Sequence, residues 1–240
     1  MSEELHGLRF DSVAELYERS RPGYAPGALE WLAERLPLPR VLDLAAGTGK
    51  LTRQLVALGA EVVAVEPSDA MRGVLERVVP QALALAGSAE EIPLPDASVD
   101  AVTVGQAFHW FEADPALAEM HRVLRNGGGI GLLWNEWDRK VPLLRVLDDI
   151  VETFRPKWID RESSRALERS RLFGVHEERR FGHAERLPAE VVVDRVASVS
   201  AIAAAEPDDR RRALEQAREL VGTGIVDFPM ITIVVVADRV

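Results

Sequence analysis

Short apolar runs alternate with amphipathic, helix-length segments along the chain up to Trp134. The runs have the length and β-branched content of buried strands, and the segments between them carry apolar residues at helical spacing. Because the spacers are long enough for helices, the pattern predicts a parallel sheet covered on both faces. The expected strands are 40–44, 62–66, 82–86, 99–104 and 130–134, and the expected helices are 12–20, 26–36, 51–58, 71–78 and 116–124.

The regular alternation of strand-like and helix-like segments ends after Trp134. Residues 141–173 and 190–221 have helical patterns, and 177–186 is a strand candidate with polar alternation. The last strand, 228–237, is expected as an antiparallel edge strand. Together these elements predict an α/β fold of three layers, doubly wound around a mostly parallel seven-stranded sheet with an antiparallel C-terminal strand. Asn126–Gly129 is expected as the turn into the fifth strand.

Composition narrows the classes of partner. A chain of 240 residues suits one α/β domain, and its net charge of −10 disfavours nucleic acid. It has no cysteine, which excludes disulfides and cysteine-ligated metal, and we expect no metal site. No apolar run reaches the ~18 residues of a membrane helix, and the acidic start, Met1–Glu4, is unlike a secretory signal. We therefore expect a cytoplasmic protein with no membrane or nucleic-acid partner, as a monomer or homodimer.

The stretch Val41–Lys50 carries the strongest chemical signal. It is typical of a buried strand that breaks into a turn with Gly47 and Gly49 and then begins a helix. A helix start offers unpaired N–H groups to an anionic or electron-rich ligand, and glycine lets that ligand approach the backbone. Asp43, at the strand end, disfavours a phosphate there. An ammonium group or ribose hydroxyls would suit it better.

Glu66 ends the second expected strand, 17 positions after Gly49. An acidic residue at this point is placed to accept hydrogen bonds from ribose hydroxyls. The turn fits a dinucleotide poorly, because Thr52 stands where the third glycine of that pattern belongs and Ala45 where the first belongs. From the residues alone, a nicotinamide-dependent oxidoreductase and a sulfonium-nucleoside enzyme both remain open, and the second fits better.

The same segments resemble the class I S-adenosylmethionine-dependent methyltransferases. Val41–Lys50 looks like their first motif, and Val62–Met71 resembles their acidic ribose motif. Further similarity to the methyltransferase type 11 group, near its trans-aconitate methyltransferase-like members, lies in 86–100, in 121–129 and in the combination of 17–24 with 106–111. The resemblance implies a Rossmann-like methyltransferase fold and S-adenosyl-L-methionine as the cofactor.

The resemblance also implies roles for single residues. It places the methionine end of the cofactor near Asp43 and Gly47, with Tyr17 and Arg21 folded over it, the ribose on Glu66, and the adenine between Pro67 and the loop holding Ser88. Ala45 departs from the family's glycine, and Ser88 from its frequent aspartate. The full implied set is Tyr17, Arg21, Asp43, Ala45, Gly47, Gly49, Glu66, Pro67, Met71, Ser88, Ala89 and Gln106.

Methyl transfer from a sulfonium is an in-line displacement that depends mainly on proximity and orientation. A base is needed only where the acceptor must lose a proton, and His109, just past the fourth strand, is the candidate. We expect a small-molecule acceptor. The alternatives are an NAD(P)-dependent oxidoreductase and a non-catalytic binding module on a methyltransferase fold.

The expected organisation is a single domain over residues 1–240. Within it we expect an N-terminal helical cap at 1–36, a cofactor-binding core at 37–138, a helical cover over the acceptor site at 139–175, and C-terminal strands and helices at 176–240 that complete the sheet.

Overall fold

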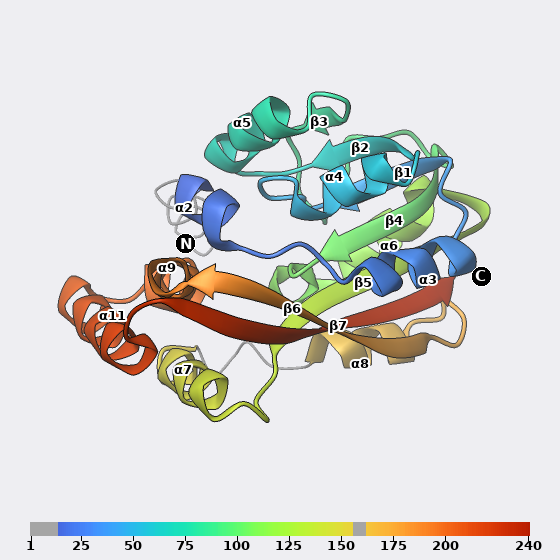
Figure 1. The fold of residues 1–240 in the computed structure, drawn as a ribbon. Coiled ribbons are helices and arrows are strands. Elements are labelled where there is room, and N and C mark those ends of the chain that lie inside the picture. The colour runs from blue at the N-terminus through green and yellow to red at the C-terminus, as the bar shows by residue number, and fades with distance from the viewer. Residues whose placement is uncertain (1–13, 156–161) are drawn as a thin grey trace.

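A seven-stranded sheet runs through the computed structural model, which describes residues 14–155 and 162–240 (Figure 1). The strand order is β3-β2-β1-β4-β5-β7-β6, and β7 alone runs antiparallel to its neighbours. This confirms the predicted fold class. The strands are β1 (Arg40–Leu44), β2 (Glu61–Val65), β3 (Leu83–Leu85), β4 (Val99–Gly105), β5 (Leu124–Trp137), β6 (Glu177–Pro188) and β7 (Ile225–Asp238).

Helices cover both faces of the sheet because successive residues of each central strand point to opposite sides. Leu42 of β1 packs under α6 and α8, whereas its neighbour Val41 packs under α3 and α4. The helices are α2 (Ala14–Ser20), α3 (Pro26–Arg35), α4 (Lys50–Ala57), α5 (Asp69–Val78), α6 (Ala113–Val123), α7 (Pro142–Glu152), α8 (Glu162–Arg169), α9 (Ala189–Ala197), α10 (Ser200–Ala203) and α11 (Pro207–Val221), with a 3₁₀ turn, η1 (Phe108–Trp110).

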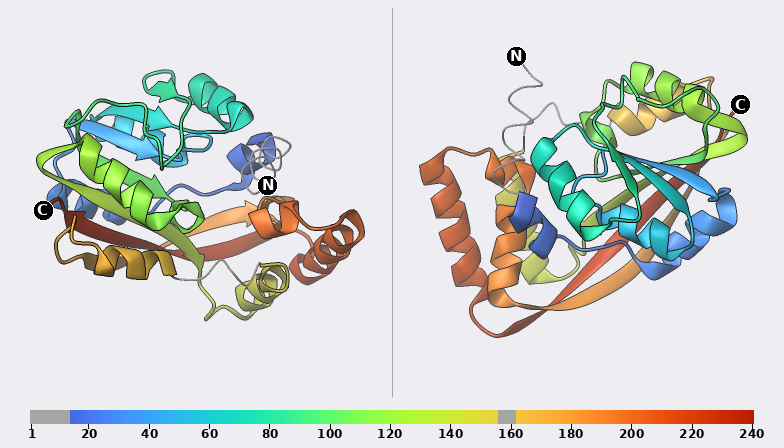
Figure 2. Two further views of the ribbon diagram at one scale, coloured as in Figure 1. Left: turned by 180° about the vertical axis from the view of Figure 1, so that it is seen from behind. Right: turned by 90° about the horizontal axis from the view of Figure 1, so that it is seen from above.

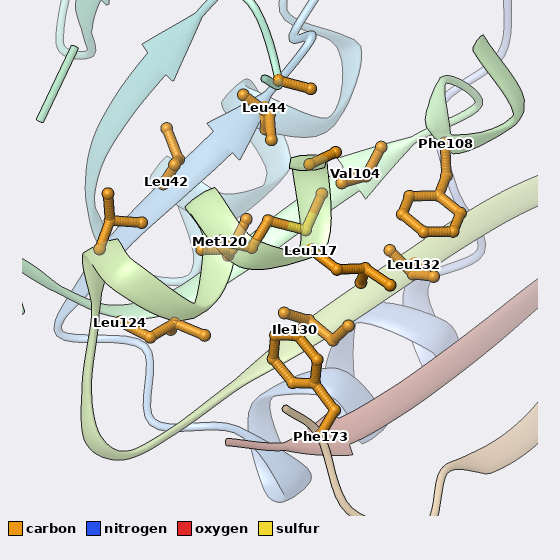
Figure 3. Packing of buried hydrophobic residues seen from close by; sticks show 14 of the residues in the cluster. Leu42, Leu44, Val104, Phe108, Leu117, Met120, Leu124, Ile130, Leu132 and Phe173 are labelled. Atoms are coloured by element: carbon orange, nitrogen blue, oxygen red, sulfur yellow. The ribbon is translucent and has the colours of Figure 1, made fainter. Parts of the chain in front are cut away.

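The larger core cluster lies between α6 and the central strands (Figure 3). Leu117 and Met120 of α6 are almost fully buried against the strands, and Phe108 of η1 closes the cluster at the strand ends. Burying a side chain of this size contributes about 1.5–3 kcal/mol to stability. The cluster therefore fixes the positions at which β1 and β4 end, and the candidate site lies at those ends.

A separate cluster joins α7, α9 and α11 around the first half of β7 (Figure 1). Beside it, the buried guanidinium of Arg195 on α9 links three elements. Its Nε donates to the Ser20 carbonyl of α2 at 2.8 Å, and its Nη2 to Glu185 of β6 at 2.6 Å, while the group stacks over Phe228 of β7. A buried charge is tolerated only with such partners, so Arg195 holds α2 against the C-terminal part of the fold.

Three local expectations from the sequence were wrong. β7 is not an edge strand, because it pairs with both β5 and β6. The helix expected at 190–221 is broken into α9, α10 and α11, and the break before α11 lies at Pro207, which lacks the N–H that would continue a helix. Asn126–Gly129 belongs to β5, where Gly127 at φ +80° lies in a bulge.

The helix expected at 141–173 corresponds to α7 and α8, and its part at 156–161 lies outside the described residues. Across 14–155 and 162–240, no helix has the length and apolar content needed to cross a membrane.

Gly129 of β5 provides a test of this packing. An added Cβ would lie 2.7 Å from the Ala237 carbonyl oxygen of β7 and 2.8 Å from Leu36. Because one of these neighbours is backbone, we expect Gly129→Ala to lower the free energy of unfolding by about 1–3 kcal/mol in urea titrations. Gly182→Ala in β6 is the matched control, since an added Cβ there meets nothing within 4 Å. Equal stability of the two variants would contradict the packing described.

Candidate functional site

Asp43 lies at the end of β1 and is only 1% exposed. Thr52, on the first turns of α4, donates its hydroxyl to Asp43 Oδ2 at 2.6 Å, and Thr103 of β4 donates to Oδ1 at 3.3 Å. Thr52, which stands where the dinucleotide-binding pattern has its third glycine, therefore has a structural role. Thr52 holds the strand-end carboxylate in place from the helix that follows the turn.

Burial is the main influence on the protonation of Asp43. It raises the pKa of this carboxyl from 3.8 to about 7, even though the hydrogen bonds from Thr52 and Thr103 act in the opposite direction. The negative charge of Glu66 raises the pKa further. Near neutral pH, the site therefore has a carboxylate whose charge is costly to keep and which a nearby cation would stabilise.

Glu66 follows β2 and is 7% exposed. Its two carboxylate oxygens accept from the backbone N–H of Gly47, at 2.8 Å, and of Ser68, at 3.0 Å. The carboxylate thus bridges the glycine turn after β1 and the start of α5. Each oxygen has two lone pairs and can accept further hydrogen bonds.

The turn after β1 is built from left-handed backbone. Gly47 and Gly49 have φ of +58° and +87°, and Ala45 has φ of +54°. Glycine adopts this region without cost, whereas an alanine there costs about 1–2 kcal/mol. Ala45 is therefore strained. A Cβ on Gly47 would meet nothing within 4 Å, so the space in front of this turn is open to a ligand.

Helix α2, which lies to the left of α4 in Figure 1, is fastened to the glycine turn through its Glu18. Thr48 donates to Glu18 Oε2 at 2.7 Å, Arg53 donates to Oε1 at 2.5 Å, and Lys50 lies 3.4 Å from the same carboxylate. Burial alone would raise the pKa of Glu18, but the bonds from Thr48 and Arg53 hold it below its usual value. This carboxylate therefore stays charged and keeps α2 over the turn.

Arg21 lies just after α2 and faces the same region. Its Nε and Nη2 donate to the hydroxyl and carbonyl of Ser198, at 2.9 and 3.0 Å, and the guanidinium lies over the Tyr17 ring. Burial lowers the pKa of Arg21, and no acidic side chain of the described ranges forms an ion pair with it. Arg21 is thus a partly buried cation whose counter-charge is not supplied by these residues.

A small pocket opens where these elements meet the ends of β4 and β5. Gln106, next after β4, has φ of +61°, a strained conformation that its side-chain bond to the Asn135 carbonyl, at 3.0 Å, helps to hold. Asn135 in turn donates to the Gly23 carbonyl at 2.9 Å. The pocket is lined by Tyr17, Arg21, Pro22, Tyr24, Lys50, Gln106, Asn135, Trp137 and Met230.

The residues expected around adenine lie along the ends of β2 and β3. Pro67 is exposed and Ser88 is half-buried, and the Ser88 hydroxyl accepts from the Glu91 N–H at 3.2 Å. Met71 is 3% exposed and packs with Ala14 and Val74 between α2 and α5. Ala89 is also buried, in the main core cluster. Met71 and Ala89 therefore take part in the core packing, whatever ligand they border.

His109, the candidate base, is half-buried in η1 beside Trp110. Burial lowers its pKa to about 4, and the positive charge of Arg155 acts in the same direction. The imidazole is therefore neutral at neutral pH, and it is a weak proton acceptor.

The sequence interpretation missed Glu18 and Asn135. Glu18 and its partner Thr48 are 30 positions apart, a contact that no local pattern indicates. Asn135 carried a usable signal, because it stands at the carboxyl end of the fifth strand, where parallel sheets bind ligands. A larger hollow of about 450 Å³ between α7 and α11 shares no residue with this site.

The strain at Ala45 predicts that Ala45→Gly stabilises the protein. Relief of the left-handed alanine outweighs the extra freedom of glycine in the unfolded chain, and we expect a net gain of about 0.5–1 kcal/mol in urea unfolding. Ala46→Gly is the control, because Ala46 is not among the positive-φ residues and should only lose stability. A loss at both positions would contradict the turn geometry.

The raised pKa of Asp43 predicts a pH-dependent cost. The folded protein holds this proton more tightly than the unfolded chain, so the contribution of Asp43 to stability falls as pH rises from about 4 to about 7 and then levels off. The Asp43→Asn variant lacks this pH-dependent contribution to stability. We expect its stability relative to the wild type to improve by about 1–3 kcal/mol between pH 5 and pH 8 in chemical denaturation without ligand. A stability difference between Asp43→Asn and the wild type that does not change with pH would contradict the raised pKa of Asp43.

Comparison with known proteins agrees with this arrangement. Residues 42–132 match a family profile described as a methyltransferase domain. An uncharacterized methyltransferase of Mycobacterium tuberculosis is 42% identical over 221 residues, which cover 90% of this chain and 86% of that protein. An uncharacterized methyltransferase of Schizosaccharomyces pombe is 39% identical over 153 residues, 62% of this chain and 61% of that protein.

Solved structures show the same architecture. A candidate type II methyltransferase from Anaeromyxobacter dehalogenans superposes with a TM-score of 0.70 at 25% identity, over 91% of this chain and 97% of that one. The pattern resemblance, the relatives and the strand order with its glycine turn agree, and the chain belongs to the class I S-adenosylmethionine-dependent methyltransferases.

Proposed function

We propose that the protein binds S-adenosyl-L-methionine across the ends of β1, β2 and β4 and transfers its methyl group to a small-molecule acceptor. The observation that carries this proposal is the bridge between Glu66 and the Gly47 N–H, which sets a carboxylate beside an open glycine turn. A carboxylate in that position accepts hydrogen bonds from the two hydroxyls of a ribose.

The charges around the turn support an amino-acid end on the ligand. Asp43 is a buried carboxylate whose ionised form a cation would stabilise, and Arg21 is a partly buried cation that forms no ion pair with an acidic side chain of the described residues. The ammonium and carboxylate of a methionine moiety would supply both missing charges. A nicotinamide dinucleotide carries phosphates, which Asp43 beside the glycine turn would repel.

The bound cofactor supplies a methyl group that is already activated by its sulfonium. The chain has to orient the acceptor and exclude water. In this proposal α2, fastened by Glu18, covers the turn, while Trp137 and Met230 line the pocket. His109, with its pKa lowered to about 4, would accept a proton only weakly, which favours acceptors that need no deprotonation.

Structural neighbours support the choice of cofactor. A geranyl diphosphate methyltransferase solved in complex with S-adenosylmethionine has a TM-score of 0.51 at 16% identity, a likeness of fold. The placement near trans-aconitate methyltransferase-like enzymes remains a prediction from the motifs.

Isothermal titration with S-adenosylmethionine and with its demethylated product tests cofactor binding. We expect Glu66→Gln to weaken binding by about 1–3 kcal/mol, because the ribose loses a charged acceptor. Glu61→Gln, at the exposed start of the strand that Glu66 follows, is the control and should bind as the wild type does. The proposal fails if the folded wild type does not bind either compound at millimolar concentration.

A further inference from the structure

Strand β6 (Glu177–Pro188) is the last strand of the sheet, with one edge open. Its inner edge pairs with β7 along the whole length, from Glu177 opposite Val236 to Pro188 opposite Ile225. Figure 2 shows β6 along the outer margin of the sheet, and no strand of the described ranges pairs with its other edge. An open edge of this length presents a row of N–H and C=O groups that can pair with another strand.

The side chains along the exposed face of β6 form a self-complementary pattern. Alternate residues from Glu178 to Arg186 are exposed, with Arg180, Gly182 and Ala184 between them. The row ends in the acidic Glu178 and the basic Arg186, and Gly182 and Ala184 between them are small, while Arg180 lies beside the acidic end and would face Ala184 of the second copy. A strand of this kind fits its own reversed copy, because reversal about the middle sets acid against base and glycine against glycine.

We propose that a second copy of this chain pairs with the open edge, antiparallel to it, on a two-fold axis through Gly182. In this register Glu178 lies opposite Arg186 of the second copy, and the symmetry repeats the pair at the other end. On the opposite face of the strand, Arg179 lies opposite Glu185 of the second copy, but this carboxylate already binds Arg195 of its own chain, so the pair adds little. Such an interface is isologous and closes as a dimer.

Neighbouring registers are disfavoured by charge. A two-fold axis at Phe181 would set Glu177 against Glu185, and an axis at His183 would set Arg180 against Arg186. Like charges directly opposite each other destabilise a strand pair, so the charge pattern selects the register centred on Gly182.

Dimerisation would require Glu178 and Arg186 to give up their ion pairs within the monomer, and this costs little free energy. In the monomer Glu178 contacts Arg180 at 3.0 Å and Arg186 contacts Asp227 at 3.2 Å, and all four side chains are well exposed. Exposed ion pairs contribute little, so giving them up costs little. Backbone hydrogen bonds along the new strand pair supply the affinity, and the charges supply its register.

Sedimentation velocity over a range of concentrations tests the interface with charge swaps. We expect a dimer for the wild type and at least about tenfold weaker association for Glu178→Arg and for Arg186→Glu, since each variant sets two like-charge pairs against each other. The double variant Glu178→Arg/Arg186→Glu should recover the wild-type association. Glu76→Arg on α5, which packs by the opposite edge strand β3, is the matched control and should remain dimeric.

Gly182→Lys is a second probe that leaves the monomer intact, because an added Cβ meets nothing within 4 Å. On the two-fold axis it would bring two lysines together, and we expect a monomer with unchanged thermal stability. A wild type that is monomeric at every concentration would overturn the proposal. So would a dimer that survives both single swaps and Gly182→Lys, or a double swap that fails to restore association.

Discussion

The buried carboxylate of Asp43 imposes the strongest constraint on this molecule. It ends a strand whose neighbours are fixed by the core beneath α6, and hydrogen bonds from Thr52 and Thr103 fix its orientation. Placing an ionisable carboxyl there raises its pKa to about 7 and makes its charge expensive in the free protein. A positively charged ligand group would offset the cost of ionising Asp43. The site therefore favours ligands that carry a positive charge at this point.

The elements around Asp43 are held by polar contacts between distant parts of the chain. Glu66 joins the glycine turn to the start of α5, Glu18 joins the turn to α2, and Arg195 joins α2 to α9 and β6. Helix α2 is therefore tied both to the proposed cofactor side and to the C-terminal side of the site. Any movement of α2 that opens the turn would break the ion pairs of Glu18.

The sequence predicted the strands well because each central strand is buried on both faces and appears as a continuous apolar run. It also placed Asp43 and Glu66 at the ends of the first two strands, which are parallel neighbours in the structure. It could not predict that β7 lies inside the sheet, because strand order depends on pairing between segments far apart. The contacts of Glu18 and the left-handed backbone of Ala45 could not be predicted for a similar reason, because both depend on neighbours that the fold brings together.

The most direct test of this account is the number of protons released when S-adenosylmethionine binds at about pH 6.5, measured by titration calorimetry in buffers of different ionisation enthalpy. A cation beside Asp43 should lower the pKa of that carboxyl and expel its proton. The account predicts net proton release by the wild type and a clearly smaller release by Asp43→Asn. Equal release by both proteins, or none by the wild type, would contradict it.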